Sequence, residues 1–343
     1  MRSSALSLPD SYRAVFLIGR QEVQLRRVPM VLPTAGEILV HIEAATTCGT
    51  DVKVFRIGGH PRMLRVPSAF GHEMAATVVA AGEGVDAWRT GDRVVVVNSA
   101  SCGTCPYCLQ NRENLCSELQ YLNGAFAEYL LVPRRFVERS THPIPPDLLS
   151  EQAALTEPLA CVLHGIEACQ ISRQAEILVL GGGPIGQLLV GALATEGHRV
   201  CLVDSNESRR AVASRMGAER VMDRQEHRQS TASFDLGVDA TGTLKGWNRA
   251  LQSVHPGGQV LFLGGCPPGS RLELDTGHIH YDELTLRGAY HHRPATAKRA
   301  LELLSERRFP AELLLTAHSG LEGTEEALRS MMRRQNLKVV LEP

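Results

Sequence analysis

The chain has 343 residues, of which 43% are hydrophobic, and it carries a formal net charge of −1. This length accommodates two domains with full-sized cores, and near-neutrality gives little reason to expect nucleic acid or an anionic membrane as a partner. No apolar run approaches the roughly 18 residues of a membrane span. The first residues, MRSSALSLPDSYR, lack the apolar core of a signal peptide. We therefore expect a cytoplasmic protein with reduced thiols.

The first part of the chain is rich in short β-type runs. From about residue 12 to residue 137, apolar stretches such as EILVHIEAA and DRVVVV are separated by Gly and Pro. This spacing predicts a mostly antiparallel, barrel-like domain, which we expect over residues 1–155. The chain ends in another β-type run, LKVVLEP, so we expect residues 293–343 to rejoin this domain.

The pattern changes near residue 146. After a helical segment, strand-like runs such as EILVL and RVCLVD alternate with helical ones such as PIGQLLVGALAT. Strands that alternate with helices predict a parallel, doubly wound sheet of the α/β class. We expect this second domain over residues 156–292.

A glycine-rich turn follows the first strand of the second domain. In LGGGPIGQ, the pattern G-x-G-x-x-G is formed by Gly181, Gly183 and Gly186. The first glycine permits a tight turn, the second lets the backbone approach a pyrophosphate, and the third lets the helix pack on the strand. The helix would begin with Pro184 and Ile185 and direct its N-terminus at the phosphates. The turn therefore predicts a dinucleotide site.

The next predicted strand ends in Asp204, at the distance of about 20 residues that is typical of this site. A carboxylate here binds the ribose hydroxyls of the adenosine and repels a 2′-phosphate. We therefore expect NAD rather than NADP as the coenzyme. Arg209 and Arg210 follow closely and keep NADP open as the alternative, because a guanidinium group binds phosphate well.

Four of the nine cysteines lie in one short segment with the spacing C-x2-C-x2-C-x7-C: Cys102, Cys105, Cys108 and Cys116. Four close thiolates suit a tetrahedral Zn²⁺ and leave no position for a substrate, so we expect a structural zinc. An iron–sulfur cluster is an alternative, although the Cys-Pro ending of the bacterial cluster motif is absent. A zinc ribbon that binds nucleic acid would need more basic and aromatic residues than Tyr107 and Arg112.

A catalytic zinc keeps three protein ligands and one open position, and the candidate ligands lie in separate segments. The segment TTCGTD contains Cys48, FGHEMAA contains His72 and Glu73, and LTEPLA contains Glu157. Successive residues of a regular strand point to opposite faces, so His72 and Glu73 would face one metal together only if Gly71 relaxes the strand. Each candidate alone also has an ordinary structural explanation.

Taken together, CGTD, GHE, the cysteine segment, EPLA and GGGPIG resemble the zinc-dependent medium-chain alcohol and polyol dehydrogenases. The combination of CGTD with EPLA is most similar to their sorbitol and threonine dehydrogenase branch, and the resemblance extends from Tyr12 to the end of the chain. It implies a GroES-like β-barrel catalytic domain, completed by the C-terminus, and a Rossmann domain that binds NAD. It also implies a small-molecule alcohol as substrate and a homodimer or homotetramer as the assembly.

Position by position, the resemblance implies that Cys48 and His72 bind a catalytic zinc, with Glu73 or Glu157 as the third ligand. It implies that the hydroxyl of Thr50 accepts the proton of the substrate alcohol while a hydride passes from carbon to the nicotinamide. The implied substrate is a secondary alcohol, polyol or sugar-like, and L-threonine or another amino alcohol is the alternative. Each chain would then hold one catalytic and one structural zinc.

The chain departs from the family pattern just after CGTD. The family has a histidine two residues later, whereas this chain has Lys53, which makes threonine a less favoured substrate. Lys53 is either a contact to the cofactor or to an anionic substrate group, or a solvated surface lysine, and His60 is a candidate to replace the missing imidazole. A zinc-ribbon nucleic-acid binder and a non-catalytic relative of the dehydrogenases are the competing function classes. The glycine-rich turn disfavours the first, and the complete ligand set disfavours the second.

Overall fold

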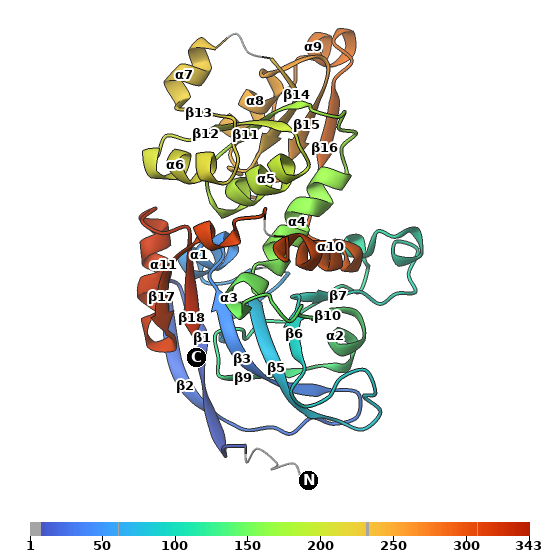
Figure 1. The fold of residues 1–343 in the computed structure, drawn as a ribbon, viewed down its shortest axis with the longest axis vertical. Helices are drawn as coiled ribbons and strands as arrows, with labels where there is room; N and C mark the ends of the chain where they lie inside the picture. The colour runs from blue at the N-terminus through green and yellow to red at the C-terminus, as the bar shows by residue number, and fades with distance from the viewer. Residues whose placement is uncertain (1–7, 61, 231–232, 307) are drawn as a thin grey trace. The chain divides into compact units, whose positions relative to one another are not determined.

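The computed structural model describes residues 8–60, 62–230, 233–306 and 308–343 (Figure 1). The chain divides into two compact units. The first unit runs to Glu157 and resumes at Leu315, and the second unit covers Pro158–Leu314. The return to the first unit comes later than the residue 293 expected from the sequence, since the helix α10 (Pro294–Leu304) is part of the second unit.

Mostly antiparallel strands form the first unit. They are β1 (Ser11–Gly19), β2 (Glu22–Pro29), β3 (Ile38–Thr46), β4 (Ser68–Ala69), β5 (Glu73–Ala81), β6 (Arg93–Val96), β7 (Ser99–Ala100), β8 (Gln120–Tyr121), β9 (Tyr129–Val132), β10 (Thr141–Pro143), β17 (Leu315–Gly320) and β18 (Lys338–Glu342). The largest sheet has the order β10-β6-β5-β3-β18-β17, with β9 also paired to β3. A second sheet has the order β2-β1-β4, and β7 pairs with β8.

The last strand of the chain lies beside β3 in the large sheet. In β18, the side chains of Val339, Val340 and Leu341 are at most 2% exposed, and Val340 is paired antiparallel with Thr46 of β3. The other edge of β3 near this point pairs with β5, where Thr46 lies opposite Glu73. Three segments distant in sequence therefore meet at the end of β3.

The helices of the first unit are α1 (Gly49–Ile57), α2 (Arg134–Arg139), α3 (Ser150–Ala153) and α11 (Thr324–Met332). α1 begins directly after β3, with Cys48 as its N-cap, and Asp51 completes a capping box. This pairing satisfies backbone N–H groups that a helix start leaves without partners. α1 buries Asp51, Val54 and Phe55 and packs against α11, so the start of the helix is fixed at the end of β3.

A six-stranded parallel sheet forms the second unit, with strands β11 (Glu176–Leu180), β12 (Arg199–Val203), β13 (Arg220–Met222), β14 (Phe234–Asp239), β15 (Val254–Phe262) and β16 (Thr285–Gly288). Their order is β13-β12-β11-β14-β15-β16, which is the order of a Rossmann sheet. The helix α4 (Thr156–Glu167) leads into this unit, and the others besides α10 are α5 (Pro184–Thr195), α6 (Glu207–Arg215), α7 (Arg224–Gln229), α8 (Leu244–Leu251) and α9 (Thr276–Tyr281).

Helices pack directly on this parallel sheet. α5 contacts β11 and β12, and α8 contacts β14 and β15. Strands that receive helices in this way are apolar along their whole length: in β11 the run Ile177–Leu180 is buried throughout. Among the described residues, no helix combines the length and the apolar character that crossing a membrane requires.

Candidate functional site

Cys48, His72 and Glu73 come together in the first unit. Their potential ligand atoms all lie within 4.8 Å of one another, and the side chains of His72 and Glu73 are only 3% and 0% exposed. The register of the large sheet explains the meeting. Cys48 follows the end of β3, and Glu73 is the first residue of the neighbouring β5.

The two adjacent residues His72 and Glu73 reach the same point because His72 precedes the strand. Gly71 has a φ of 83°, a left-handed conformation that glycine adopts without strain. A Cβ at this position would also lie 2.3 Å from the ring of Phe126. The alternation of strand side chains therefore starts only at Glu73, and it does not separate the two side chains.

Asp51 holds both the helix start and the histidine. One oxygen of its buried carboxylate accepts a hydrogen bond from the backbone N–H of Cys48 at 2.9 Å, and the other lies 2.9 Å from Nδ1 of His72. Burial alone would lower the pKa of His72, but the carboxylate of Asp51 raises this pKa well above its ordinary value. A histidine whose Nδ1–H donates a hydrogen bond to a carboxylate offers Nε2 to a metal, as is usual for metal-binding histidines.

Glu73 is paired with a lysine from the last strand. Lys338 and Glu73 form an ion pair in which both side chains are fully buried, and Lys338 also donates to the carbonyl oxygen of Thr47 at 2.9 Å. Burial opposes the charge of Lys338, yet Glu73 and Cys48 raise its pKa. The hydroxyl of Thr46 donates to the same Glu73 oxygen, Oε2. The sequence analysis did not identify Lys338, although a lysine within the apolar run LKVVLEP was a signal for it.

The second oxygen of Glu73 fits the role of a metal ligand. Among the described residues, Oε1 of Glu73 is buried and has no hydrogen-bond partner. Such an oxygen costs free energy unless something binds it. Burial, and then the negative charge of Glu73, also raise the pKa of the Cys48 thiol, so a cation is needed to stabilise the thiolate. A thiolate, an imidazole and a carboxylate form a three-ligand set typical of catalytic zinc.

The other predicted residues of this site lie in two places. Thr50 is the second residue of α1, and its backbone N–H lies 3.4 Å from the sulfur of Cys48. Glu157 is 6% exposed and lies in the first turn of α4. Within the described part of the chain, the group that contains Cys48 includes Glu73 and does not include Glu157.

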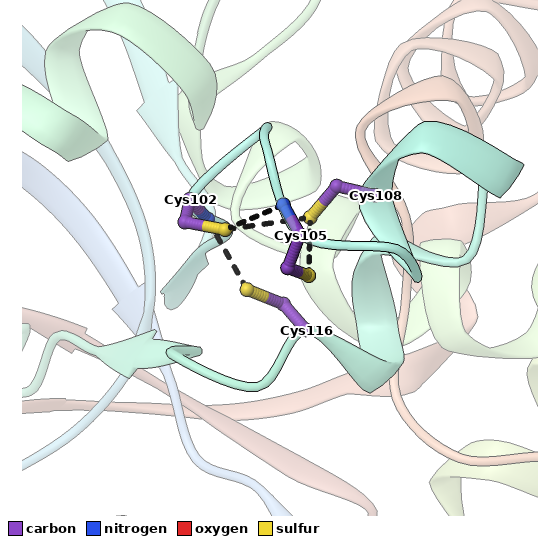
Figure 2. Close-up of side chains that lie close together, drawn as sticks. All are labelled: Cys102, Cys105, Cys108 and Cys116. Atoms are coloured by element: carbon purple, nitrogen blue, oxygen red, sulfur yellow. Dashed lines mark hydrogen bonds between the residues drawn. The ribbon is translucent and has the colours of Figure 1, made fainter.

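The four clustered cysteines form a separate site (Figure 2). Their sulfur atoms lie within 4.8 Å of one another, with 3.5 Å between Cys105 and Cys108 and 3.9 Å between Cys102 and Cys108. A tetrahedral zinc with Zn–S bonds of about 2.3 Å places its sulfurs about 3.8 Å apart. Backbone N–H groups favour the thiolate of Cys105 and lower its pKa to about 5. Burial raises the pKa of Cys108 to about 12, so a bound cation would be needed to keep all four sulfurs as thiolates. The cluster therefore has the spacing that a structural zinc requires.

In the second unit, the three glycines of the turn differ in what surrounds them. Gly181 has a φ of 101°. An added Cβ at Gly183 would meet nothing within 4 Å, whereas one at Gly186 would lie 1.8 Å from the carbonyl oxygen of Gly181. Gly183 is the N-cap of α5 and leaves open space in front of the helix, and Gly186 permits close packing. These are the features of a turn that receives a pyrophosphate.

Asp204 follows β12 and is hydrogen bonded to the same turn. Its carboxylate accepts from the backbone N–H groups of Gly182 and Asn206, both at 2.8 Å. The guanidinium of Arg210 donates to the backbone carbonyl of Asp204 at 2.9 Å. Arg209 lies in the first turn of α6, and its Cβ would be 3.2 Å from a Cβ added at Gly182. The structure thus brings Asp204 and Arg209 to the turn.

Comparison with known proteins extends these observations. Residues 34–145 match the alcohol dehydrogenase GroES-like domain, and residues 184–306 match the zinc-binding dehydrogenase domain. The D-altritol 5-dehydrogenase of Agrobacterium fabrum is 33% identical, covering 81% of this chain and 83% of the relative. The sorbitol dehydrogenase of Bacillus subtilis is 29% identical, covering 98% and 99%.

Solved structures agree with the sequence matches. A protein described as a zinc-binding dehydrogenase from Sinorhizobium meliloti, bound to NADP, is 28% identical with a TM-score of 0.90 and covers 98% of this chain and 100% of its own. The expected fold class, a GroES-like barrel together with a Rossmann domain, is therefore confirmed.

Proposed function

Because the chain belongs to the zinc-dependent medium-chain alcohol and polyol dehydrogenases, we propose that it oxidises a secondary hydroxyl group of a polyol or sugar-like molecule and passes the hydride to NAD. The observation that carries this proposal is the group formed by Cys48 and the buried His72 and Glu73, with an unpartnered carboxylate oxygen among the described residues. Three protein ligands leave the fourth position of a tetrahedral zinc open for the substrate, as in catalytic sites, whereas structural sites fill all four positions with protein ligands.

The first part of the proposal concerns the metal ligands. Cys48, His72 and Oε1 of Glu73 are proposed to bind the catalytic zinc, with Glu157 as the alternative third ligand. Bound zinc supplies Lewis-acid polarisation of the substrate oxygen. Asp51 fixes the ring of His72 through Nδ1, and Lys338 holds the other oxygen of Glu73. A carboxylate that is anchored at one oxygen presents the second in a fixed direction.

The second part concerns the proton of the substrate. We propose that the Thr50 hydroxyl accepts it, since Thr50 lies two residues beyond Cys48 at the start of α1. Its backbone is fixed there by the N–H contact to the sulfur of Cys48. The hydroxyl is both donor and acceptor, so it can receive the substrate proton while it passes its own to water, because Thr50 is partly exposed. Threonine dehydrogenases are among the relatives, such as that of Idiomarina loihiensis, which is 27% identical over 89% of this chain. The ammonium group of an amino alcohol is disfavoured here by the positive charge of Lys53.

The third part concerns the coenzyme. Asp204 places a negative charge at the glycine-rich turn, where it would repel the 2′-phosphate of NADP and bind the hydroxyls of NAD. Arg209 and the NADP found in the similar structure from Sinorhizobium meliloti support the alternative. We propose NAD because the carboxylate of Asp204 is held in place by two backbone N–H groups.

The remaining parts concern the second metal and the assembly. We propose that the four-cysteine cluster holds a structural zinc, so that each chain binds two zinc ions. We also propose a cytoplasmic homodimer or homotetramer. The strand β16 lies at the edge of its six-stranded sheet, and such an edge offers backbone groups to a second copy.

The test is an assay of the purified, zinc-loaded protein with NAD and a panel of polyols, sugar alcohols, amino alcohols and simple secondary alcohols. We expect NADH formation with polyols, and we expect the Thr50→Ala variant to lower kcat by two orders of magnitude or more. The conservative Thr50→Ser variant, which keeps the hydroxyl, should retain most of the activity. If amino alcohols alone were oxidised, the polyol assignment would be wrong.

A further inference from the structure

The segment between two site residues carries charge of one sign. Residues 52–72, which lie between Asp51 and Glu73, contain Lys53, Arg56, Arg62 and Arg65 and no Asp or Glu. The chain as a whole has slightly more acidic than basic residues, so this segment is not typical of it. A cationic segment that is flanked at both ends by residues of the candidate zinc site favours an anionic ligand near this site.

Lys53 lies on the same face of α1 as Thr50. The two are three residues apart and are therefore neighbours on the helix surface, with Lys53 about 4.5 Å further along the axis. The buried face of α1 carries Asp51, Val54 and Phe55, whereas Thr50 and Lys53 are partly exposed. A molecule bound at the hydroxyl of Thr50 thus has the Lys53 ammonium group one helical turn away.

His60 lies near Lys53 and offers a hydrogen-bond donor. Its Nδ1 accepts hydrogen bonds from the backbone N–H groups of Arg62 and Met63 at 3.2 and 3.1 Å, so the proton of the neutral ring is on Nε2. Burial, and then the positive charges of Lys53 and Arg62, lower the pKa of His60. The ring is therefore neutral near pH 7, and Nε2 is a donor that cannot accept a proton.

The turn that carries His60 is fixed by backbone hydrogen bonds. The N–H of His60 donates to the carbonyl of Leu64 at 2.8 Å, and the N–H of Leu64 donates back at 3.3 Å. These bonds occupy the backbone N–H and carbonyl of His60, and Nδ1 accepts the two bonds from Arg62 and Met63, so Nε2–H is the donor that the ring can offer to a ligand. His60 is thereby unsuited to replace the missing imidazole as a base, and it is suited to bind an anion.

We propose that Lys53 and His60 form a subsite for an anionic oxygen group, a carboxylate or a phosphate, carried by the polyol whose hydroxyl is oxidised beside Thr50. The substrate class is then an acidic sugar derivative, either a sugar acid or a polyol phosphate, rather than a neutral polyol. This inference rests on the proposed function, because it assumes that the alcohol binds beside Thr50. Lys53 supplies the charge, and His60 supplies a directed donor.

The experiment compares three sets of stereoisomers with the zinc-loaded protein and NAD: neutral hexitols, hexonates and hexitol phosphates. We expect the best acidic compound to have a kcat/KM at least tenfold above the best neutral one, and the two acidic sets distinguish a carboxylate from a phosphate as the group bound. Lys53→Gln should raise KM for acidic substrates at least tenfold more than KM for neutral ones, with a smaller effect on kcat.

Three further variants separate the subsite from general effects. Lys53→Arg keeps the charge and should restore most of the affinity. His60→Asn keeps an acceptor near Nδ1 for the turn but removes the Nε2 donor, so it should raise KM for acidic substrates alone. Lys298→Gln removes an exposed lysine charge from α10, outside the 52–72 segment, and is the matched control that should change neither constant.

Direct binding separates this inference from the proposed function. Titration calorimetry with the best-binding hexonate or hexitol phosphate should show that Lys53→Gln weakens binding at least tenfold, whether or not turnover occurs. Binding that depends on Lys53 without oxidation of any alcohol would support the subsite and contradict the dehydrogenase function. Oxidation of neutral polyols, with the kinetic constants of every substrate set equal in Lys53→Gln and wild type, would overturn the subsite and leave the function standing.

Discussion

The two cysteine-containing sites of the first unit are built in opposite ways. The four-cysteine cluster takes all its ligands from one segment of 15 residues, Cys102–Cys116, and lies in short turns where Leu109 is 73% exposed. The site of Cys48 takes its residues from the segment that follows β3, from the start of β5 and the residue before it, and from the last strand. The side chains of His72, Glu73 and Lys338 are almost fully buried. If both sites bind zinc as proposed, the first depends on its metal for its structure, whereas the second depends on the surrounding strands to bring its ligands together.

This difference explains why the sequence predicted every ligand of the first site but did not identify Lys338 in the second. Local spacing alone predicts four converging thiolates in a turn. In contrast, Lys338 lies 265 residues from Glu73, and only the register of β18 beside β3 brings them together. If the assembled site is catalytic and the local one structural, substitutions in the two sites should have different effects.

The largest effect is expected for Cys48→Ser. Serine keeps a capping oxygen at the start of α1 but removes the thiolate, so the catalytic zinc should be lost. We expect kcat/KM to decrease at least a thousandfold. Metal analysis should find about one zinc per chain instead of two, with unchanged circular dichroism. The control is Cys169→Ser in the second unit, which should keep both zinc ions. Full activity of Cys48→Ser would contradict the assignment of the two roles.

The next effect is expected for Lys338→Met, which leaves the carboxylate of Glu73 buried without its cation. Removal of one partner from a buried ion pair costs about 3–5 kcal/mol of unfolding free energy. Urea denaturation should measure this loss, and the exposed Lys298→Met should change stability by less than about 0.5 kcal/mol. Addition of Glu73→Met to Lys338→Met should recover much of the stability, because it removes the unpaired charge. A loss no larger than that of Lys298→Met would show that the ion pair does not anchor Glu73.

Features with a local sequence pattern were predicted from the sequence, whereas contacts between distant segments were not. The G-x-G-x-x-G turn and the β-type runs have local patterns, and the comparisons confirm the two-domain fold class that these patterns predicted. The sequence also placed Cys48, His72 and Glu73 among the candidates. It did not predict that Asp51 would both cap α1 and hold His72, since a helix-capping aspartate has the same local pattern without a histidine beside it.

A smaller effect is expected for Cys105→Ser in the local site. Loss of one thiolate should release the structural zinc and loosen the loop, which buries few apolar side chains of its own. We expect a decrease of about 1–3 kcal/mol in unfolding stability and faster proteolysis between residues 102 and 116. The kcat per folded molecule should be retained, in contrast to Cys48→Ser, and chelator treatment should reproduce the loosening. A decrease in kcat as large as that of Cys48→Ser, with the loop still resistant to protease, would reverse the roles of the two sites.

The smallest effect concerns a third kind of site, in which one distant residue completes a local turn. Asp204 accepts hydrogen bonds from Gly182 and Asn206, and Asp204→Asn keeps one acceptor oxygen while it removes the negative charge. If the charge selects NAD, this variant should lower the preference for NAD over NADP about tenfold, or about 1.4 kcal/mol, measured as the ratio of the two kcat/KM values.

The matched control for this effect is Asp223→Asn. Asp223 is the N-cap of α7 in the same unit, and asparagine caps a helix about as well, so the coenzyme ratio should not change. The double variant Asp204→Asn/Arg209→Gln separates the two charges at the turn. If Arg209 binds the 2′-phosphate once Asp204 is neutral, the second substitution should reverse the gain in NADP use. A wild-type preference for NADP that Arg209→Gln abolishes would instead show that the guanidinium, and not the carboxylate, selects the coenzyme.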